Sequence, residues 1–175
     1  MNARTSAAVC YLGILAAAVA AAPKSSTPKP WVLRFDGAGP VKVGMSLAQL
    51  NTALNENFSM PEDEDEKACF FAESAKYPGI AFMVQSGRVT RVDVIKPNIA
   101  TASGIRVGDS EALVMKVYGQ KLKVEPHAYT GPEGHYLTVY SPDGRYGLRF
   151  ETDGQKVTGF YAGERHAIAY VEGCL

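Results

Sequence analysis

Three histidines are the side chains of this sequence best suited to acid–base chemistry near neutral pH. His127, His135 and His166 lie in three different segments. A hydrolase of the serine type needs a nucleophile, a base and a group that orients the base, and no G-x-S-x-G motif supplies such a nucleophile here. The sequence therefore predicts a protein without catalytic activity and without a cofactor. The alternative is a small periplasmic hydrolase that uses one histidine in a cleft.

A run of five acidic residues, 62–66, is the densest local charge. Its spacing differs from that of an EF-hand calcium loop, and the central glycine of such a loop is missing. The run therefore predicts a solvated, mobile loop and no bound metal. The alternative is an electrostatic contact between this loop and a partner protein.

Tyrosine and arginine side chains are predicted to form a binding surface on an open sheet face. Leu137 and Val139 alternate with tyrosines in the predicted strand 135–141, and a second strand is predicted at 146–151. If the aliphatic side chains face the helices, the other face carries a set of larger polar side chains. These are Tyr136, Tyr140 and Arg149, with Arg91 in a similar register of the first half. Tyrosine and arginine are enriched at protein interfaces. The alternative is a wet face stabilised by cross-strand pairs alone.

The N-terminal residues resemble a secretory signal peptide. Arg4 precedes a run of 16 apolar residues at 7–22, which ends in small side chains of the A-x-A type. A membrane-spanning helix needs about 20 such residues, so a membrane anchor is the weaker interpretation. Residues 23–30, which are rich in proline, serine and lysine, predict a flexible tether. We expect a periplasmic or secreted protein whose mature chain is not inserted in a membrane.

The cysteines predict a disulfide bond. Cys10 stands inside the leader, which leaves Cys69 and Cys174 as an even pair in an exported chain. Neither belongs to a Cys-His motif, and a zinc site would need four ligands at recognisable spacing. A bond across 105 positions would join the middle of the chain to its C-terminal end. By loop entropy it would stabilise the fold by about 4 kcal/mol.

The elements that must position these side chains occur twice. Val43-Gly44-Met45-Ser46 and Val107-Gly108-Asp109-Ser110 each join a short β-prone segment to a helical pattern. Serine is well suited to cap a helix, and Ser46 with Gln49 has the spacing of a capping box. Apolar faces are predicted for both helices. They comprise Leu47, Leu50, Ala53 and Leu54 in the first, and Leu113, Val114 and Val117 in the second, which Gly119 ends.

Three strands are predicted after each helix. The first group is 69–73, 79–85 and 88–95, and the second is 135–141, 146–151 and 156–162. The connections Ser86-Gly87, Pro142-Asp143-Gly144 and Asp153-Gly154 are strong turn signals. We therefore predict an α+β domain over 31–175. It is a tandem of two units of short strand, helix and three-stranded antiparallel meander, at about 38–96 and 103–174, with the helices packed on one face of the sheet.

The V-G-M-S and V-G-D-S openings, each followed by a helix and a meander, resemble a known group of α+β modules. It contains the β-lactamase inhibitory proteins and the small outer-membrane-assembly lipoproteins of the SmpA/BamE type. This resemblance implies an exported module that binds other proteins, of an inhibitor-like or assembly-accessory kind. The chain departs from the lipoproteins because it has two units and no cysteine at the end of the leader. No functional residue is transferred by the resemblance.

Composition limits the partners. The chain has 175 residues and 46% hydrophobic residues, which suffices for one domain or two small packed halves. Its 18 basic residues balance 18 acidic residues, and the isoelectric point is about 6.8. A nucleic-acid-binding protein would be expected to show a basic stripe and a high isoelectric point. The expected partner is therefore another envelope or extracellular protein.

Overall fold

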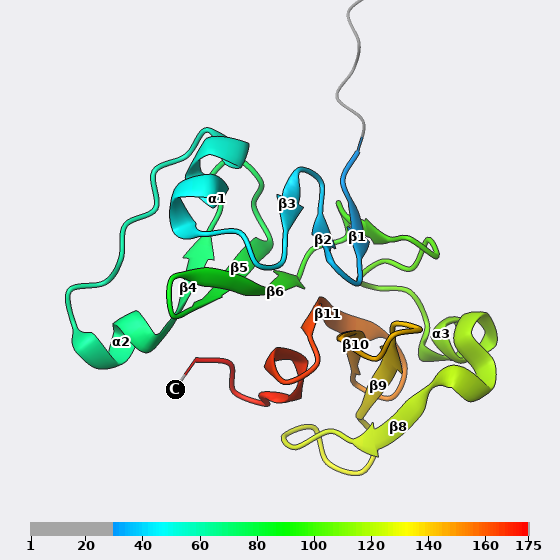
Figure 1. Ribbon diagram of the computed structural model, residues 1–175. Helices are drawn as coiled ribbons and strands as arrows, with labels where there is room; N and C mark the ends of the chain where they lie inside the picture. Colours follow the sequence, from blue (N-terminus) through cyan, green and yellow to red (C-terminus); the bar gives the residue numbers. More distant parts are fainter. Residues whose placement is uncertain (1–29, 175) are drawn as a thin grey trace, which may run out of the picture.

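A computed structural model describes residues 30–174 as a mixed α+β fold in which strands predominate (Figure 1). The predicted signal peptide and residues 23–29 of the predicted tether lie outside the described residues. The strands form one sheet of seven strands and one of four. In Figure 1, strands β1 to β3 of the small sheet (blue to cyan) lie above the place where the two groups of strands of the large sheet meet.

The large sheet is antiparallel and brings two groups of strands together at its centre. Its spatial order is β4 (Cys69–Glu73), β5 (Ile80–Gln85), β6 (Arg88–Val94), β11 (Val157–Glu164), β10 (Tyr146–Thr152), β9 (His135–Tyr140) and β8 (Lys123–Pro126). Strands β6 and β11 meet with Val94 opposite Phe160 and Val92 opposite Ala162. The six predicted strands of the two meanders are confirmed, with ends that differ by only one or two residues.

The small sheet was only partly predicted. Its order is β3 (Val41–Lys42), β2 (Gly37–Ala38), β1 (Val32–Arg34) and β7 (Ala100–Thr101). Strand β7, from the connection between the two groups, pairs in parallel with β1. Gly37 permits the tight β2–β3 hairpin, because its φ is +145° and an added Cβ would lie 2.1 Å from a backbone oxygen. These strands are too short to give a periodic signal.

One hydrophobic core contains side chains from both sheets and two helices. Leu50 and Leu54 of α1 (Leu47–Leu54) and Val114 of α3 (Glu111–Tyr118) are buried in it. Its largest fully buried side chains include Phe82, Phe150, Phe160, Leu33 and Leu137. At about 25 cal/mol per Å² of apolar surface, this burial is the main stabilising contribution to the fold.

Each of these helices starts beside a glycine that is hydrogen-bonded to a sheet strand. The Gly44 N–H donates to the Val89 carbonyl over 2.7 Å, and the Gly108 N–H donates to the Val157 carbonyl over 2.8 Å. Both glycines have φ of +92°, a region that side chains disfavour. Ser46 then caps α1 in the predicted capping box with Gln49, and Ser110 caps α3 by accepting from the Leu113 N–H. The two predicted caps are confirmed.

Replacement of either capping serine is expected to lower the free energy of unfolding by about 1 kcal/mol, because each loses a bond to an otherwise unpaired N–H. Ser46→Ala and Ser110→Ala are to be compared with the wild type by urea denaturation. Ser59→Ala is the control, since Ser59 is exposed and lies outside the helices. A change below about 0.3 kcal/mol in both capping variants would contradict this account.

The structure corrects two sequence predictions in the helices. The predicted acidic loop contains a short helix, α2 (Glu64–Ala68), because the Asp63 side chain caps its first N–H groups. The run itself is exposed, as expected. The predicted apolar face of the second helix is wrong in part. Only Val114 of that face is buried, whereas Leu113 is 38% and Val117 42% exposed.

The C-terminal segment, which we define as residues 165–174, returns across the large sheet. It contains a short 3-10 helix at Ala167–Ala169 and ends at Cys174, which forms the predicted disulfide with Cys69 at the start of β4. Figure 1 shows this segment (red) below β6 and beside β11, with its end on the side of α2. The disulfide is thus confirmed, and it fastens the chain end to an edge strand of the sheet.

Candidate functional site

The face of the large sheet opposite the core carries a row of charged and aromatic side chains. Alternation along β6, β11, β10 and β9 sends Val92, Phe160 and Phe150 into the core and their neighbours to this second face. The second face carries Arg91, Asp93, Tyr161, Arg149, Glu151, Thr138 and Tyr136. We call these residues the polar cluster.

The sequence placed four binding residues on an open face, and the structure corrects this placement. Arg91, Arg149 and Tyr136 are only 4%, 7% and 5% exposed. Tyr140 alone remains partly exposed, with the Arg165 guanidinium 4.5 Å from its ring centre. The C-terminal segment lies over Arg91, which donates to its Ala167 and Tyr170 carbonyls, whereas the His127 ring stacks on Tyr136 and Arg149 lies between Tyr136 and Glu125. No periodic pattern in the sequence predicted these covering contacts. Direct contact between a partner and the three buried side chains is therefore not available in this conformation.

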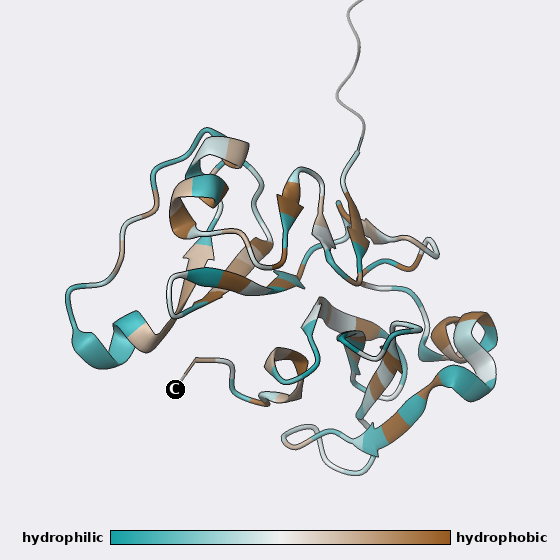
Figure 2. Ribbon diagram, viewed as in Figure 1, coloured by the Kyte–Doolittle hydropathy of each residue, from teal (hydrophilic) through white to brown (hydrophobic). Residues whose placement is uncertain are grey.

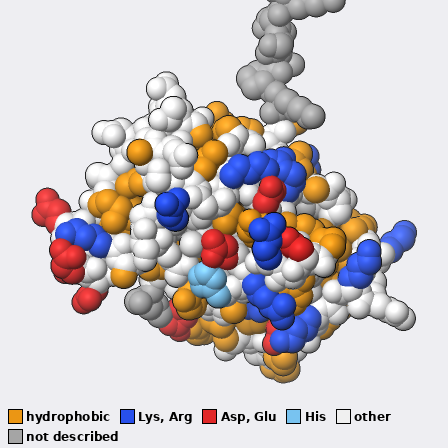
Figure 3. All heavy atoms as spheres, in the orientation of Figure 1, with side chains coloured by type: hydrophobic (Ala, Val, Ile, Leu, Met, Phe, Trp, Pro, Cys, Tyr) orange, Lys and Arg blue, Asp and Glu red, His pale blue; other side chains and the backbone are white. Residues whose placement is uncertain are grey.

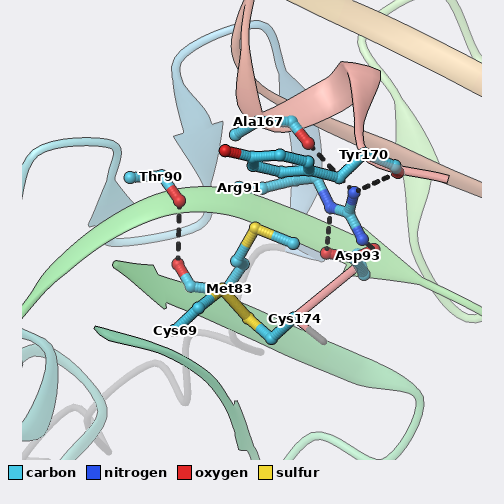
Figure 4. Close-up of a disulfide and its surroundings, with 8 residues drawn as sticks. All are labelled: Cys69, Met83, Thr90, Arg91, Asp93, Ala167, Tyr170 and Cys174. Carbon is cyan, nitrogen blue, oxygen red and sulfur yellow. Dashed lines mark hydrogen bonds and ion pairs between the residues drawn. A yellow bond between two sulfur atoms is a disulfide. The ribbon is translucent and has the colours of Figure 1, made fainter. Parts of the chain in front are cut away.

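Arg91 is the centre of one half of the polar cluster. Its guanidinium donates to both carboxylate oxygens of Asp93 at 3.0 and 2.9 Å. It also donates to the carbonyl of Ala167 over 3.0 Å and that of Tyr170 over 3.2 Å (Figure 4). The Tyr161 ring lies 4.2 Å from its central carbon, a cation–π contact. Arg91 thus ties the C-terminal segment to the sheet.

Two acidic groups beside Arg91 have altered pKa values. Burial raises the pKa of Asp93 to about 6, assisted by the Glu151 charge and opposed by the Arg91 charge and hydrogen bonds. Burial also raises the pKa of the Tyr161 hydroxyl above its usual value, again with Glu151 contributing. That hydroxyl donates to a Glu151 carboxylate oxygen over 3.1 Å. The cluster therefore holds Tyr161 neutral and makes Asp93 sensitive to mildly acidic pH.

The stability of the wild type is expected to fall, relative to Asp93→Asn, as the pH rises from about 4 to about 6. The folded-state pKa of about 6 lies above the ordinary value of 3.8, so in this window the folded state binds more protons than the unfolded state. The free energy of unfolding must then decrease with rising pH. Asparagine has no such titration, whereas all other groups are common to both proteins.

The measurement is urea denaturation of both proteins at several pH values between about 3.5 and 7.5. The difference between the two free energies of unfolding should change through this window and be constant outside it. If the free energies of unfolding of the two proteins changed with pH in parallel, Asp93 would have its ordinary pKa in the folded protein.

Arg149 is the centre of the second half of the polar cluster. Its Nε donates to Thr138 Oγ1 over 2.9 Å, and a Glu125 carboxylate oxygen lies 3.6 Å from its Nη2. The Tyr136 ring lies 5.0 Å from its central carbon, and the His127 ring stacks on Tyr136 at 4.4 Å. These contacts bury the arginine and stabilise the sheet edge between β8 and β10.

A cavity of about 210 Å³ opens inside the cluster. Its floor is at Gly159, which has no side chain, and its walls include Asp93, Glu151 and Tyr161. Residues 171–173 of the C-terminal segment line its outer side. Sequence reasoning missed this arrangement, although the polar residues Asp93 and Glu151 alternate with buried valine and phenylalanine in β6 and β10.

Each imidazole lies beside a carboxylate, but within the described residues none is hydrogen-bonded to a hydroxyl, since His135 meets the Thr152 hydroxyl only through its backbone. His135 Nδ1 lies 3.1 Å from the Glu111 carboxylate, and the Thr152 hydroxyl donates to that carboxylate rather than to the imidazole. Thr152 is fully buried, so its oxygen is not open to a substrate. His127 and His166 lie 3.8 and 3.3 Å from Glu151 and Glu164. Glu111, at the start of α3, is thus linked to His135 of β9 and to Thr152 of β10.

An apolar groove of about 600 Å³ lies between the small sheet and the β9–β10 turn. Apolar side chains line it, with charged groups near its mouth. The lining comprises Leu33, Arg34, Phe35, Asp36, Ala102, Tyr118, Ser141, Pro142, Asp143, Tyr146 and Leu148. Hydrogen bonds from Ser141 and Arg145 hold the pKa of Asp143 down at about 2, so its carboxylate stays ionised beside the apolar wall.

Among residues 30–174 no group of three or more histidine, cysteine or acidic side chains is arranged to hold a metal ion. In the same range no helix has the length and apolar character needed to cross a membrane.

The fold defines a disulfide-bonded protein of the mixed α+β class. No family model matches the chain, and no curated protein matches it. A solved structure with a partly similar arrangement is that of the uncharacterized protein yfeY from Escherichia coli, with 11% sequence identity and a TM-score of 0.45. The similarity covers 74% of this chain and 97% of that one.

Proposed function

We propose that the protein is an exported, non-catalytic module that binds another protein of the cell envelope or the extracellular space. The observation that carries the proposal is the apolar groove beside α3. A hollow of about 600 Å³ with mainly apolar walls and a few charged groups has the size and lining to receive an anchoring side chain of a partner. Phe35, Tyr118 and Tyr146 supply aromatic walls.

Exposed apolar side chains on α3 and β8 support the same proposal. Leu113 and Val117 are four residues apart and share one side of α3. Val124, on the edge strand β8, is also exposed and lies opposite Leu137, a core residue. Figure 2 shows the corresponding brown segments on α3 and β8. Such surface is unusual on a protein without a partner, because its exposure to water is unfavourable.

The non-catalytic part of the proposal is supported by the histidine environments. A hydrolase of the serine or cysteine type would need a hydroxyl or thiol within reach of an imidazole. The Thr152 hydroxyl near His135 is buried and directed at Glu111. An inhibitor-like or assembly-accessory role agrees with this. The balanced charge also favours a protein partner over nucleic acid.

We also propose that the chain consists of two copies of one helix–meander unit with their helices on one face of the sheet. Ser46 forms an isolated bridge with Arg88, and Ser110 forms the corresponding bridge with Lys156. The hydrogen bonds of Gly44 and Gly108 match as well. These contacts support a duplication, and they agree with the resemblance to the inhibitory proteins and assembly lipoproteins.

The experiment is capture of partners from envelope extract with the purified protein, followed by titration calorimetry with the partner that is found. Ala102→Trp should lower the affinity at least tenfold, because Ala102 is exposed and its enlarged side chain would fill the groove. Ala48→Trp is the matched control, since Ala48 is exposed on α1 and does not line the groove. A partner that binds both variants equally would remove the groove from the proposal.

A further inference from the structure

The Cys69–Cys174 disulfide lies in an open hollow rather than inside the core. This hollow has a volume of about 420 Å³ and is lined by both cysteines, Gln85 and residues 170–173. Both cysteines are partly exposed. Thiol–disulfide exchange requires a thiolate to reach a sulfur atom. The hollow and the partial exposure of both cysteines leave room for this approach in the folded protein.

The disulfide is also the main attachment of the last residues of the C-terminal segment. The segment is anchored at Ile168, which is fully buried in a notch over Gly147, where an added Cβ would lie 2.1 Å from its Cδ1. Beyond that point, Tyr170 and Val171 are 43% and 42% exposed. The noncovalent contacts of this end in the described structure include hydrogen bonds to the Tyr170 carbonyl and to Glu172, and the approach of Gly173 to Phe71.

Residues 171–173 cover the cavity of the polar cluster. The cavity walls combine charged side chains, among them Arg91 and Asp93, with apolar ones such as Phe71 and Ile95. The charged groups gain hydration when they are uncovered, which offsets part of the hydrophobic stabilisation of the cover. The attachments of the segment therefore contribute to holding it in place. Figure 4 shows the disulfide and the Arg91–Asp93 pair on the same side of the strands, with Met83 beside them.

We propose that this disulfide is a redox latch: a dithiol reductant opens it in the folded protein, and residues 170–174 then leave the polar cavity. The latch lies apart from the apolar groove and does not depend on the proposed function. Its effect is confined to the chain end, because Ile168 and the sheet core stay in place.

Complete reduction of the disulfide consumes two thiol groups of the reductant. One thiolate attacks a sulfur of the pair, forms a mixed disulfide and displaces the other cysteine as a thiolate, which takes up a proton. The second thiol of the reductant then displaces the remaining protein cysteine. Two electrons pass to the protein, which gains the Cys69 and Cys174 thiols, and the reductant becomes its own disulfide.

The acidic run gives the latch a preference among thiols. Glu64, Asp65 and Glu66 lie in α2, which leads directly into Cys69. Figure 3 shows red side chains over α2 at the edge of the molecule. Their negative field disfavours an anionic reductant and favours a cationic one, and salt weakens the effect. Reduction should therefore be fastest with cysteamine, slower with 2-mercaptoethanol and slowest with glutathione, after correction for the thiolate fraction of each.

The first test is the rate of reduction of the wild-type protein by dithiothreitol. If the latch opens in the folded protein, the rate constant should lie within about tenfold of that for the unfolded chain. It should also be independent of urea below the unfolding transition. A rate that is several orders of magnitude slower and rises with urea would show that the bond opens only on unfolding, and would overturn the proposal.

The second test measures hydrogen exchange and the titration of Asp93 by NMR. It compares the oxidised wild type with the dithiothreitol-reduced wild type and with the Cys69→Ser/Cys174→Ser double variant. Backbone amides of 170–174 should lose protection from hydrogen exchange at least tenfold, while those of β10 and β11 keep theirs. The Asp93 carboxyl should titrate at a lower pKa than in the oxidised protein, because water reaches it. Unchanged exchange and titration, or global unfolding of both reduced forms, would overturn the latch.

Discussion

Arg91→Met is expected to lower the free energy of unfolding by about 3–5 kcal/mol at pH 7. The substitution keeps most of the side-chain volume but removes the guanidinium that donates to both Asp93 oxygens and to two carbonyls of the C-terminal segment. Asp93 is then left buried without its counter-charge, which is the costly way to break a buried ion pair. Urea denaturation of the purified variant measures the loss.

The loss should be smaller at pH 5 than at pH 7. With Arg91 absent, Asp93 can remain protonated in the folded state at the lower pH, and its desolvation then costs less. The double variant Arg91→Met/Asp93→Leu should recover most of the stability, since an apolar pair of similar volume often replaces a buried ion pair without loss. Lys121→Met, at an exposed position, serves as the control for the change in net charge and should shift stability by less than about 0.5 kcal/mol.

A double variant as unstable as Arg91→Met would contradict this account. It would mean that the two hydrogen bonds from Arg91 to the C-terminal segment, rather than the pair with Asp93, carry the stabilisation. That result would also identify Arg91 as a second fastening of the segment beside the disulfide.

Cys69→Ser and Cys174→Ser are expected to destabilise the protein equally, each by about 4 kcal/mol, because both remove the same cross-link of 105 residues. The size follows from the loop that the bond closes in the unfolded chain. Denaturation in the absence of reductant compares the two variants with the oxidised wild type. Addition of dithiothreitol should bring the wild type to the level of the variants and leave the variants unchanged.

Unequal losses would mean that one cysteine has a packing role besides the bond. Free thiols that react in the oxidised, folded wild type would contradict the pairing itself. Equal losses well below about 4 kcal/mol would contradict the predicted size and would mean that the freed chain end regains much of the entropy in the folded state.

The elements with strong local signals were those that the sequence predicted. The strands of both meanders, the caps at Ser46 and Ser110 and the disulfide depend on alternation, capping chemistry and cysteine count, which act over a few residues or by elimination. The short strands β2 and β7 were missed because two residues carry no periodicity. The β-prone segment predicted before Gly44 is confirmed as β3, whereas the corresponding segment before Gly108 forms no strand. The short helix at Glu64–Ala68 was missed because a capping aspartate outweighed a composition typical of a loop.

The candidate site likewise has features that local sequence patterns predict and features that only tertiary contacts decide. The sequence by itself determined which side chains alternate onto the second face of the sheet, since the period of a strand is two and the valine, leucine and phenylalanine residues fix the core side. Only the tertiary structure decided that this face is covered. Cover depends on Ile168 reaching Gly147 and on Cys174 reaching Cys69, contacts between residues far apart in the chain that no local pattern encodes. The C-terminal segment thus covers Arg91, whereas Tyr136 lies under the His127 ring and Arg149 lies among Tyr136, Thr138 and Glu125. We therefore propose the apolar groove by α3, rather than this sheet face, as the surface for a partner.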